Sequence, residues 1–191
     1  AEITKTCYEF KETTLGDPDF NNINIDQILS DRFIENLISK INIDKVYSSK
    51  NLYVTSNPET VYLTVVDRDL NAVSFINSIC HVFGSGITTA NSGILFQNRG
   101  VNFRLEKNHP NCIEGGKRPL HTIIPGLLTN ANNETILSYG VMGGQYQPIG
   151  QSHVLQNIID YEQSIQEAID FPRAFALNGD LKVEKSIDYN I

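Results

Sequence analysis

The sequence predicts an α+β fold with antiparallel strands, and three observations point to this class. Residues 61–66 and 72–78 are β-rich runs, and the polar residues 67–71 between them have the composition of a hairpin turn. An amphipathic helical stripe comes before these runs, and a second one follows the later apolar runs. Strands joined by hairpins, with helices outside them, are typical of antiparallel layered folds.

Upstream of the first strand we expect one helix and little other regular structure. Residues 1–25 are predicted to be a lead-in without strands, with GDPDFNN at 16–22 forming a turn. Residues 26–41 are predicted to form a single helix with Asp26 as its N-cap, because apolar side chains recur at helical spacing. The polar stretch 47–59 is predicted to be an exposed connector.

Downstream of the predicted hairpin, short apolar runs occur at residues 93–96, 123–128 and 135–142. A second helix is predicted from about residue 152 to residue 168, and Pro172 would end it. Residues 181–184 are predicted to form one more strand.

The composition excludes several classes of protein. The 191 residues are 40% hydrophobic and 19% charged, which is typical of a folded domain. A net charge of −7 disfavours nucleic acids and anionic membranes as partners. No run reaches the roughly 20 apolar residues that span a bilayer. The first residues include neither an initiator Met nor an apolar signal core, so we expect a processed or excised piece and leave its compartment open between cytoplasm, periplasm and secretion.

No metal or cofactor motif stands out. The three cysteines are too few and scattered for a disulfide framework, so we expect free and mostly buried thiols. The four histidines lie far apart, and neither HExxH nor GxSxG occurs. Cys80 beside His81 suggests a thiol dyad, but neighbouring strand residues face opposite ways, so we discount it.

Several motifs in order carry a specific resemblance. They are PETVYLTVVDRDLNAVSFINS at 58–78, FGSGI at 83–87, SGILFQNRG at 92–100, GKRPLHTIIPG at 116–126 and GVMGGQYQPIG at 140–150. From Thr60 to about residue 185 the chain resembles the small subunit of γ-glutamyltranspeptidases, and LGDPDF at 15–20 resembles the tail of their large subunit.

This resemblance implies the αββα sandwich of the N-terminal-nucleophile (Ntn) hydrolases, present here in part. Residues 1–59 would be the end of the large subunit with a connector, and residues 60–191 most of the small subunit without its last strands. The remainder of the large subunit, from the same precursor, would be the protein partner. No cofactor or metal is implied.

The resemblance also assigns catalytic roles. The precursor would cut itself between Glu59 and Thr60, and Thr60 would become the nucleophile, with its freed α-amine as the base. Ser78 matches a second hydroxyl that supports the nucleophile. Gly143 and Gly144 match a pair whose backbone amides form the oxyanion hole, where glycine permits close approach.

The substrate-binding positions differ from the usual family pattern. Where the family holds the glutamyl α-amino group with Asn, Gln and Asp, this chain has Cys80, Arg99 and Asn102. Where the family holds the α-carboxylate with two serines, this chain has His121 and Thr122. A cationic Arg99 and a neutral Asn102 suit an ammonium group poorly, and Arg is well shaped for a carboxylate.

This variant pattern looks closer to the branch with oxamate amidohydrolases and cephalosporin-type acylases. The segment 103–117 is short beside members with a lid loop, which would favour hydrolysis over transfer. The predicted function is a γ-glutamyltransferase-like amidohydrolase or acyltransferase that acts on small-molecule γ-glutamyl amides such as glutathione. Two alternatives stay open: an amidase for a small carboxylate-bearing amide (oxamate or a glutaryl amide), and an unprocessed homologue with a binding or structural role.

Overall fold

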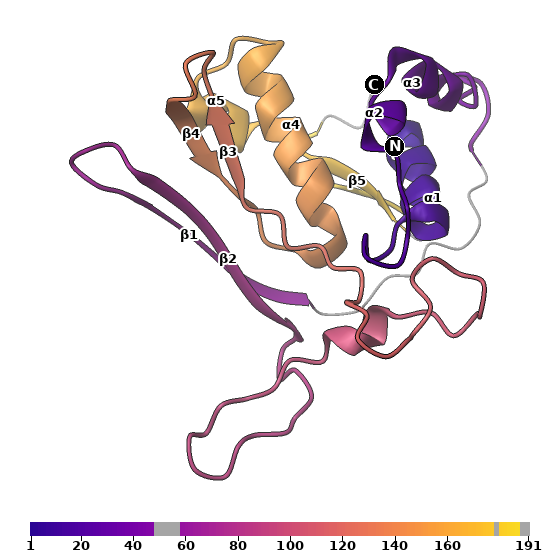
Figure 1. Cartoon of the computed structure of the whole chain (residues 1–191). Coiled ribbons are helices and arrows are strands. Elements are labelled where there is room, and N and C mark those ends of the chain that lie inside the picture. The colour runs from indigo at the N-terminus through magenta and orange to yellow at the C-terminus, as the bar shows by residue number, and fades with distance from the viewer. Residues whose placement is uncertain (48–57, 178–179, 188–191) are drawn as a thin grey trace. The chain divides into compact units, whose positions relative to one another are not determined.

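The fold of the protein, described by a computed structural model for residues 1–47, 58–177 and 180–187, combines helices with antiparallel hairpins (Figure 1). The chain divides into two compact units. The first contains Ala1–Val54, Asn102–Leu120 and Pro172–Ile191, and the second contains Thr55–Val101 and His121–Phe171. The first unit therefore joins segments that are far apart in the sequence.

The second unit is built on a long hairpin of β1 (Pro58–Val66) and β2 (Ala72–His81), which confirms the predicted strands. The Asp67 carboxylate organises the turn, because its Oδ1 accepts the N–H groups of Asp69 and Asn71, each at 2.9 Å. Its Oδ2 accepts Asn71 Nδ2 at 2.8 Å. These bonds from Asn71 lower the pKa of Asp67, so the turn is held by an ionised side chain.

A second hairpin, of β3 (Gly126–Thr129) and β4 (Thr135–Tyr139), packs beside the first. The hydroxyl of Tyr62 on β1 lies 3.0 Å from the Ser138 hydroxyl on β4, and Ser74 Oγ donates to the Tyr139 carbonyl at 3.2 Å. A Cβ atom at Gly140 would lie 2.4 Å from the Tyr62 ring. The close approach of β4 to β1 therefore requires glycine at that position.

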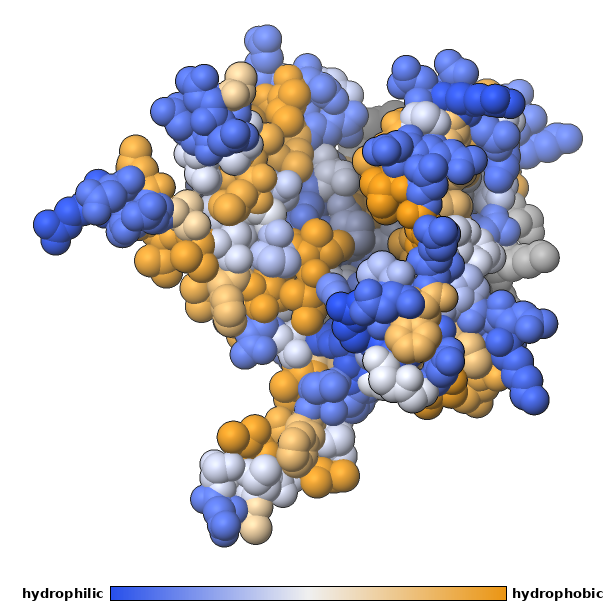
Figure 2. Space-filling view, in the orientation of Figure 1, coloured by the Kyte–Doolittle hydropathy of each residue, from blue (hydrophilic) through white to orange (hydrophobic). Residues whose placement is uncertain are grey.

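The opposite face of the β1–β2 hairpin is apolar and exposed. Leu63 pairs with Phe75 and Val65 with Val73, and all four side chains are exposed to solvent. Figure 2 shows the hydrophobic side chains gathered over this hairpin. An apolar strand face of this kind is typical of a surface that another layer of the protein covers.

The second unit also contains a helical region that differs from the prediction. The single helix expected at 152–168 is two helices, α4 (Gln147–Ile159) and α5 (Ile165–Asp170), preceded by the short 3₁₀ helix η2 (Gly144–Tyr146). A capping box between Ser164 and Glu167 starts α5 as a separate helix. The apolar periodicity continues across the break between the two helices and therefore does not reveal it. The helical region ends before Pro172, as predicted.

The first unit begins with α1 (Glu2–Thr14), and residues 1–25 contain no strand, as expected, although the helix itself was not predicted. Thr4, Thr6 and Tyr8 are its buried residues, and the Tyr8 ring meets Phe175 edge-on with centroids 6.4 Å apart. Because threonine has a low helix propensity and is not apolar, this helix gave little periodic signal. The predicted turn follows it, with turn residues at 18–20.

The helix expected at 26–41 is also two helices, α2 (Ile25–Ile28) and α3 (Asp31–Ile38). Their N-caps are Asn24 and Ser30, whose side chains accept backbone N–H groups, so the N-cap prediction for Asp26 is wrong. Asp26 lies in the first turn instead, where its negative charge interacts favourably with the helix dipole.

The remaining elements of the chain are short. The strand predicted at 181–184 corresponds to β6 (Asp180–Val183), which pairs with β5 (Ala174–Leu177), and the 3₁₀ helix η1 spans Arg99–Asn102. Most of the connector predicted at 47–59, residues 48–57, lies outside the described residues. Among the described residues, no helix has the length and apolar character to cross a membrane. Of the three free cysteines only Cys80 is buried, fewer than expected.

Candidate active site

The predicted cleavage site lies in β1, at an irregularity in its pairing with β2. Glu59 pairs with Cys80 and Val61 with Asn77, so two residues of β2, Ser78 and Ile79, lie opposite Thr60 alone. Such a β-bulge bends the strand and re-aims side chains, and bulges are common beside active sites. Thr60 itself is partly buried.

The Ser78 side chain contacts the peptide group at which cleavage is predicted. Its hydroxyl donates to the Glu59 carbonyl oxygen at 2.8 Å, and its oxygen accepts the Cys80 N–H at 3.0 Å. The Glu59 carbonyl belongs to the Glu59–Thr60 peptide group. A donor on that oxygen withdraws electron density from the carbonyl carbon and stabilises negative charge that develops on the oxygen.

The two glycines predicted for the oxyanion hole adopt backbone conformations that other residues rarely adopt. Gly143 has φ +123° and Gly144 has φ +55°, which are conformations that favour glycine. Within residues 58–177 and the other described segments, the N–H groups of these two glycines donate to no acceptor. The short helix η2, which begins at Gly144, contacts β1, the strand that carries Thr60.

Arg99 interacts with three of the candidate site residues of the second unit. Its Nη2 donates to the Ser78 carbonyl oxygen at 3.0 Å. Burial lowers the pKa of His121, and the positive charge of Arg99 lowers it further. The same charge opposes the effect of burial, which raises the pKa of Cys80. Arg99, Cys80 and His121 thus share one electrostatic environment with Ser78, and Thr122 follows His121 as a half-buried residue.

Cys80 and His81 do not form a thiol dyad. Cys80 has φ +80°, so the alternation of faces that argued against the dyad does not hold at this residue. The conclusion stands on other grounds, because burial raises the pKa of the Cys80 thiol and disfavours the thiolate. His81 Nδ1 is engaged with Asn98 Nδ2 at 2.7 Å.

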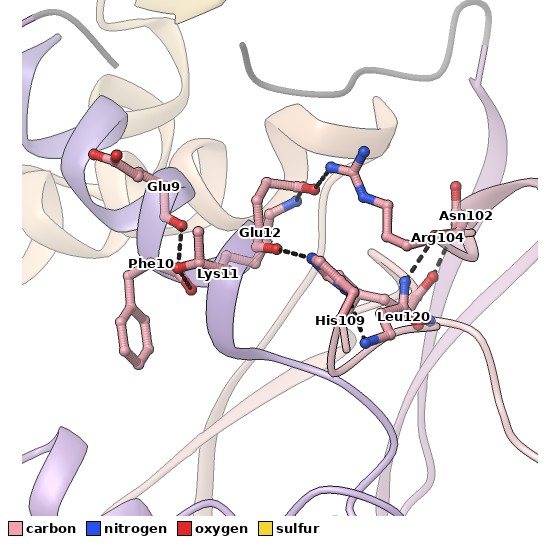
Figure 3. Close-up of polar contacts among 10 residues, drawn as sticks. Glu9, Phe10, Lys11, Glu12, Asn102, Arg104, His109 and Leu120 are labelled. Carbon is pink, nitrogen blue, oxygen red and sulfur yellow. Dashed lines mark hydrogen bonds and ion pairs between the residues drawn. The ribbon is translucent and has the colours of Figure 1, made fainter. Parts of the chain in front are cut away.

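Asn102 is the one predicted site residue that belongs to the first unit. Its Nδ2 donates to the Leu120 carbonyl at 2.9 Å, and its own carbonyl accepts Asn111 Nδ2 at 2.7 Å. Asn111, only 2% exposed, also accepts the Leu120 N–H at 3.1 Å and so ties the two ends of this segment together. Figure 3 shows Asn102 and Leu120 side by side. No pattern in the sequence distinguishes Asn111, because a buried Asn looks like any loop Asn.

No metal site is visible in the described part of the chain, where no three His, Cys, Asp or Glu side chains gather. The groups that β1, β2 and η1 bring to this region are the hydroxyls of Thr60 and Ser78 and the guanidinium group of Arg99.

Solved structures identify the class of the fold. Over 99% of this chain and 34% of the other, the structure matches a cephalosporin acylase from Bacillus halodurans with a TM-score of 0.85 and 35% identity. An acivicin-inhibited gamma-glutamyltranspeptidase matches over 68% of this chain and 75% of the other, with a TM-score of 0.60 and 30% identity. The chain therefore has the α+β fold of the Ntn hydrolases.

The family follows from the sequence comparisons. The gamma-glutamyltranspeptidase family model matches residues 1–191, and the chain belongs to that family. It is 36% identical to the glutathione hydrolase-like YwrD proenzyme of Bacillus subtilis and 34% identical to the oxamate amidohydrolase proenzyme of Klebsiella pneumoniae. Each match covers 90% of this chain but 32% of the relative, so the chain spans about a third of the length of these relatives.

Proposed function

We propose that the whole protein is a γ-glutamyltransferase-like amidohydrolase that cleaves itself between Glu59 and Thr60 and then uses Thr60 as its nucleophile. Residues 1–59 would end the large subunit and residues 60–191 would form most of the small one. The observation that supports this most directly is the hydrogen bond from Ser78 Oγ to the Glu59 carbonyl oxygen, 2.8 Å long. It places a donor on the one carbonyl that self-cleavage must activate.

Self-cleavage follows from this arrangement in two balanced steps. Thr60 Oγ attacks the Glu59 carbonyl carbon, the Glu59–Thr60 C–N bond breaks, and the hydroxyl proton passes to the departing amine. The resulting ester is hydrolysed by water, which leaves a Glu59 carboxylate and restores the Thr60 hydroxyl. Ser78 stabilises the negative charge on the carbonyl oxygen during the attack.

Turnover uses the group that cleavage releases. The α-amine of Thr60, with an ordinary pKa near 8, accepts the hydroxyl proton while Thr60 Oγ attacks the substrate amide. The N–H groups of Gly143 and Gly144, which have no acceptor among the described residues, hold the oxyanion, and an acyl-enzyme forms. Water then releases the acid, or an amine acceptor takes the acyl group.

The proposed acyl donors are γ-glutamyl amides such as glutathione, in keeping with the glutathione hydrolase names among the relatives. A second candidate, a small carboxylate-bearing amide of the oxamate or glutaryl type, is favoured by the guanidinium of Arg99 at the Ser78 carbonyl. A cation there attracts a carboxylate and repels an ammonium group. Parallel assays of a γ-glutamyl anilide, oxamate and a glutaryl amide distinguish the two, because only the first candidate cleaves the anilide.

The test of the proposed function is the intact mass of the full-length protein and of two variants. The wild type should give two fragments divided between residues 59 and 60, and Thr60→Ala should give one chain because it lacks the attacking oxygen. Thr60→Ser is the matched control, since it retains a hydroxyl and should still divide. A wild type that stays in one piece after prolonged incubation would support the unprocessed, non-catalytic homologue instead.

A further inference from the structure

In the first unit, a buried carboxylate from before the Glu59–Thr60 bond binds an arginine from after it. The Asp17 side chain is 1% exposed. Arg118 donates to it from its backbone N at 2.6 Å, from Nε at 3.0 Å and from Nη2 at 2.6 Å. A carboxylate removed from water needs such partners, and the side-chain bonds have the parallel geometry that arginine provides.

Two further contacts connect the same two stretches of chain. Gly16 packs so closely on the Pro110 carbonyl that a Cβ atom at residue 16 would lie 2.5 Å from its oxygen. Near the end of α1, Glu12 Oε2 accepts Arg104 Nη2 at 2.6 Å, and the Glu12 carbonyl lies 2.6 Å from His109 Nε2. Figure 3 shows Arg104 and His109 directed at Glu12 from the segment 102–120.

Cleavage would turn these contacts within one chain into contacts between two polypeptides. As long as the chain is continuous, they are contacts within one molecule, and the covalent link keeps their partners together. After cleavage, Asp17 and Arg118 belong to different polypeptides, and only non-covalent contacts hold the two together. Asp17 is the most deeply buried charged group among these contacts. Its replacement should therefore lower the free energy of association more than a substitution at an exposed contact would.

We propose that Asp17 and Arg118 form a cross-subunit latch that keeps the two products of self-cleavage associated. This inference rests on the proposed function, since it needs the bond between Glu59 and Thr60 to break. The partner of the small subunit at this surface is the segment after α1 of the large subunit, and the recognition is a buried carboxylate on a guanidinium.

The experiment compares Asp17→Asn with Asp19→Asn in the full-length protein after cleavage. Asp19 makes the same kind of contact, Oδ2 to Arg118 Nη2 at 2.7 Å, but its side chain is 75% exposed, so the substitution is a matched chemical control. Native mass spectrometry across a dilution series measures subunit association. We expect Asp17→Asn to weaken it by about tenfold or more, and Asp19→Asn by about threefold or less.

The same substitution in a Thr60→Ala background separates association from folding. That protein remains one chain, and a melting transition with Asp17→Asn would show that the first unit still folds. If Asp17→Asn prevents folding there, Arg118→Lys replaces it: the charge and the backbone N–H remain, the parallel side-chain bonds are lost, and association should again weaken.

The outcomes distinguish the two proposals. Cleaved subunits that dissociate equally in the wild type, Asp17→Asn and Arg118→Lys would overturn the latch and leave the cleavage mechanism intact. A wild type that never divides overturns both, because no subunits then exist for the latch to join. Cleavage with selective dissociation of the Asp17 or Arg118 variants supports both.

Discussion

Arg99 brings a positive charge to the residues that follow the predicted nucleophile. Its guanidinium donates to the Ser78 carbonyl, and its charge acts on both Cys80 and His121. For His121 burial is the larger cause of the lowered pKa and Arg99 the smaller one. The imidazole is therefore neutral at neutral pH, and the cation available to a substrate is Arg99 alone among these three residues.

Replacing Arg99 by Gln should raise the pKa of His121 toward its ordinary value of 6.5 without reaching it. The repulsion by the guanidinium disappears, while the burial remains. The lowered pKa also makes folding stability depend on pH. Below pH 6.5 the unfolded chain binds more protons at His121 than the folded chain does, so this residue destabilises the folded state as the pH falls. Titration of the imidazole by NMR measures the shift.

Arg68→Gln, in the exposed turn between β1 and β2, is the control for this titration and should leave His121 unchanged. An identical His121 titration in the wild type and in Arg99→Gln would show that the charge of Arg99 does not act on His121.

Among the elements, the register of the β1–β2 hairpin decides which hydroxyl contacts the carbonyl of the proposed cleavage site. The bulge opposite Thr60 brings Ser78 Oγ to the Glu59 oxygen. Ser78→Ala should therefore slow self-cleavage by about 100- to 1,000-fold, because a donor to a developing oxyanion is lost. The half-time of precursor disappearance on a denaturing gel measures this.

Ser78→Thr keeps the hydroxyl and should cleave within a few-fold of the wild-type rate. If Ser78→Ala matured as fast as the wild type, the hydrogen bond to Glu59 would have no part in cleavage, although Thr60 could still be the nucleophile.

The elements show where sequence reasoning succeeds. The β1–β2 hairpin was predictable because its signal is local: two β-rich runs and the turn that Asp67 organises. Helix α1 was not, because its buried residues include two threonines, which carry no helical signal. The predicted long helices merged shorter ones, because Ser30 and Ser164 interrupt the helix without interrupting the apolar periodicity.

The residues of the candidate site were predictable from motif positions, but their contacts were not. The family resemblance supplied Thr60, Ser78 and the two glycines as candidates from motif positions, and their catalytic roles stay predictions. The contact of Ser78 with Glu59 depends on a bulge, which no local pattern reveals. Asp17 and Arg118 lie 101 positions apart, so only the folded chain shows their pairing.

At the scale of the whole molecule, the association of the cleaved subunits should depend on acid. Hydrogen bonds from Arg118 hold the pKa of Asp17 well below the ordinary 3.8. Those from its side chain have the larger effect, and the one from its backbone N–H has a smaller effect. A lowered carboxyl pKa stabilises the paired state fully above the ordinary value, and that contribution declines as the pH falls below 3.8. Size-exclusion chromatography at stepped pH should therefore show separation beginning below about pH 4.

Asp17→Asn isolates this residue from other carboxyl groups that titrate in the same range. It should remove part of the acid dependence and weaken association at neutral pH. Superimposable pH profiles for the wild type and Asp17→Asn would mean that other groups cause the separation.

The hydrogen bond between Ser78 and Glu59 has a consequence for biosynthesis. During translation Thr60 is synthesised before Ser78, and Arg118 is synthesised later still. A nascent chain that ends soon after Thr60 has the attacking oxygen but lacks the donor, and the chain must grow through β2 before the reactive carbonyl is activated. Under the proposed mechanism, the order of translation would delay scission until the downstream strand has emerged, which would protect an unfinished polypeptide from being divided too early.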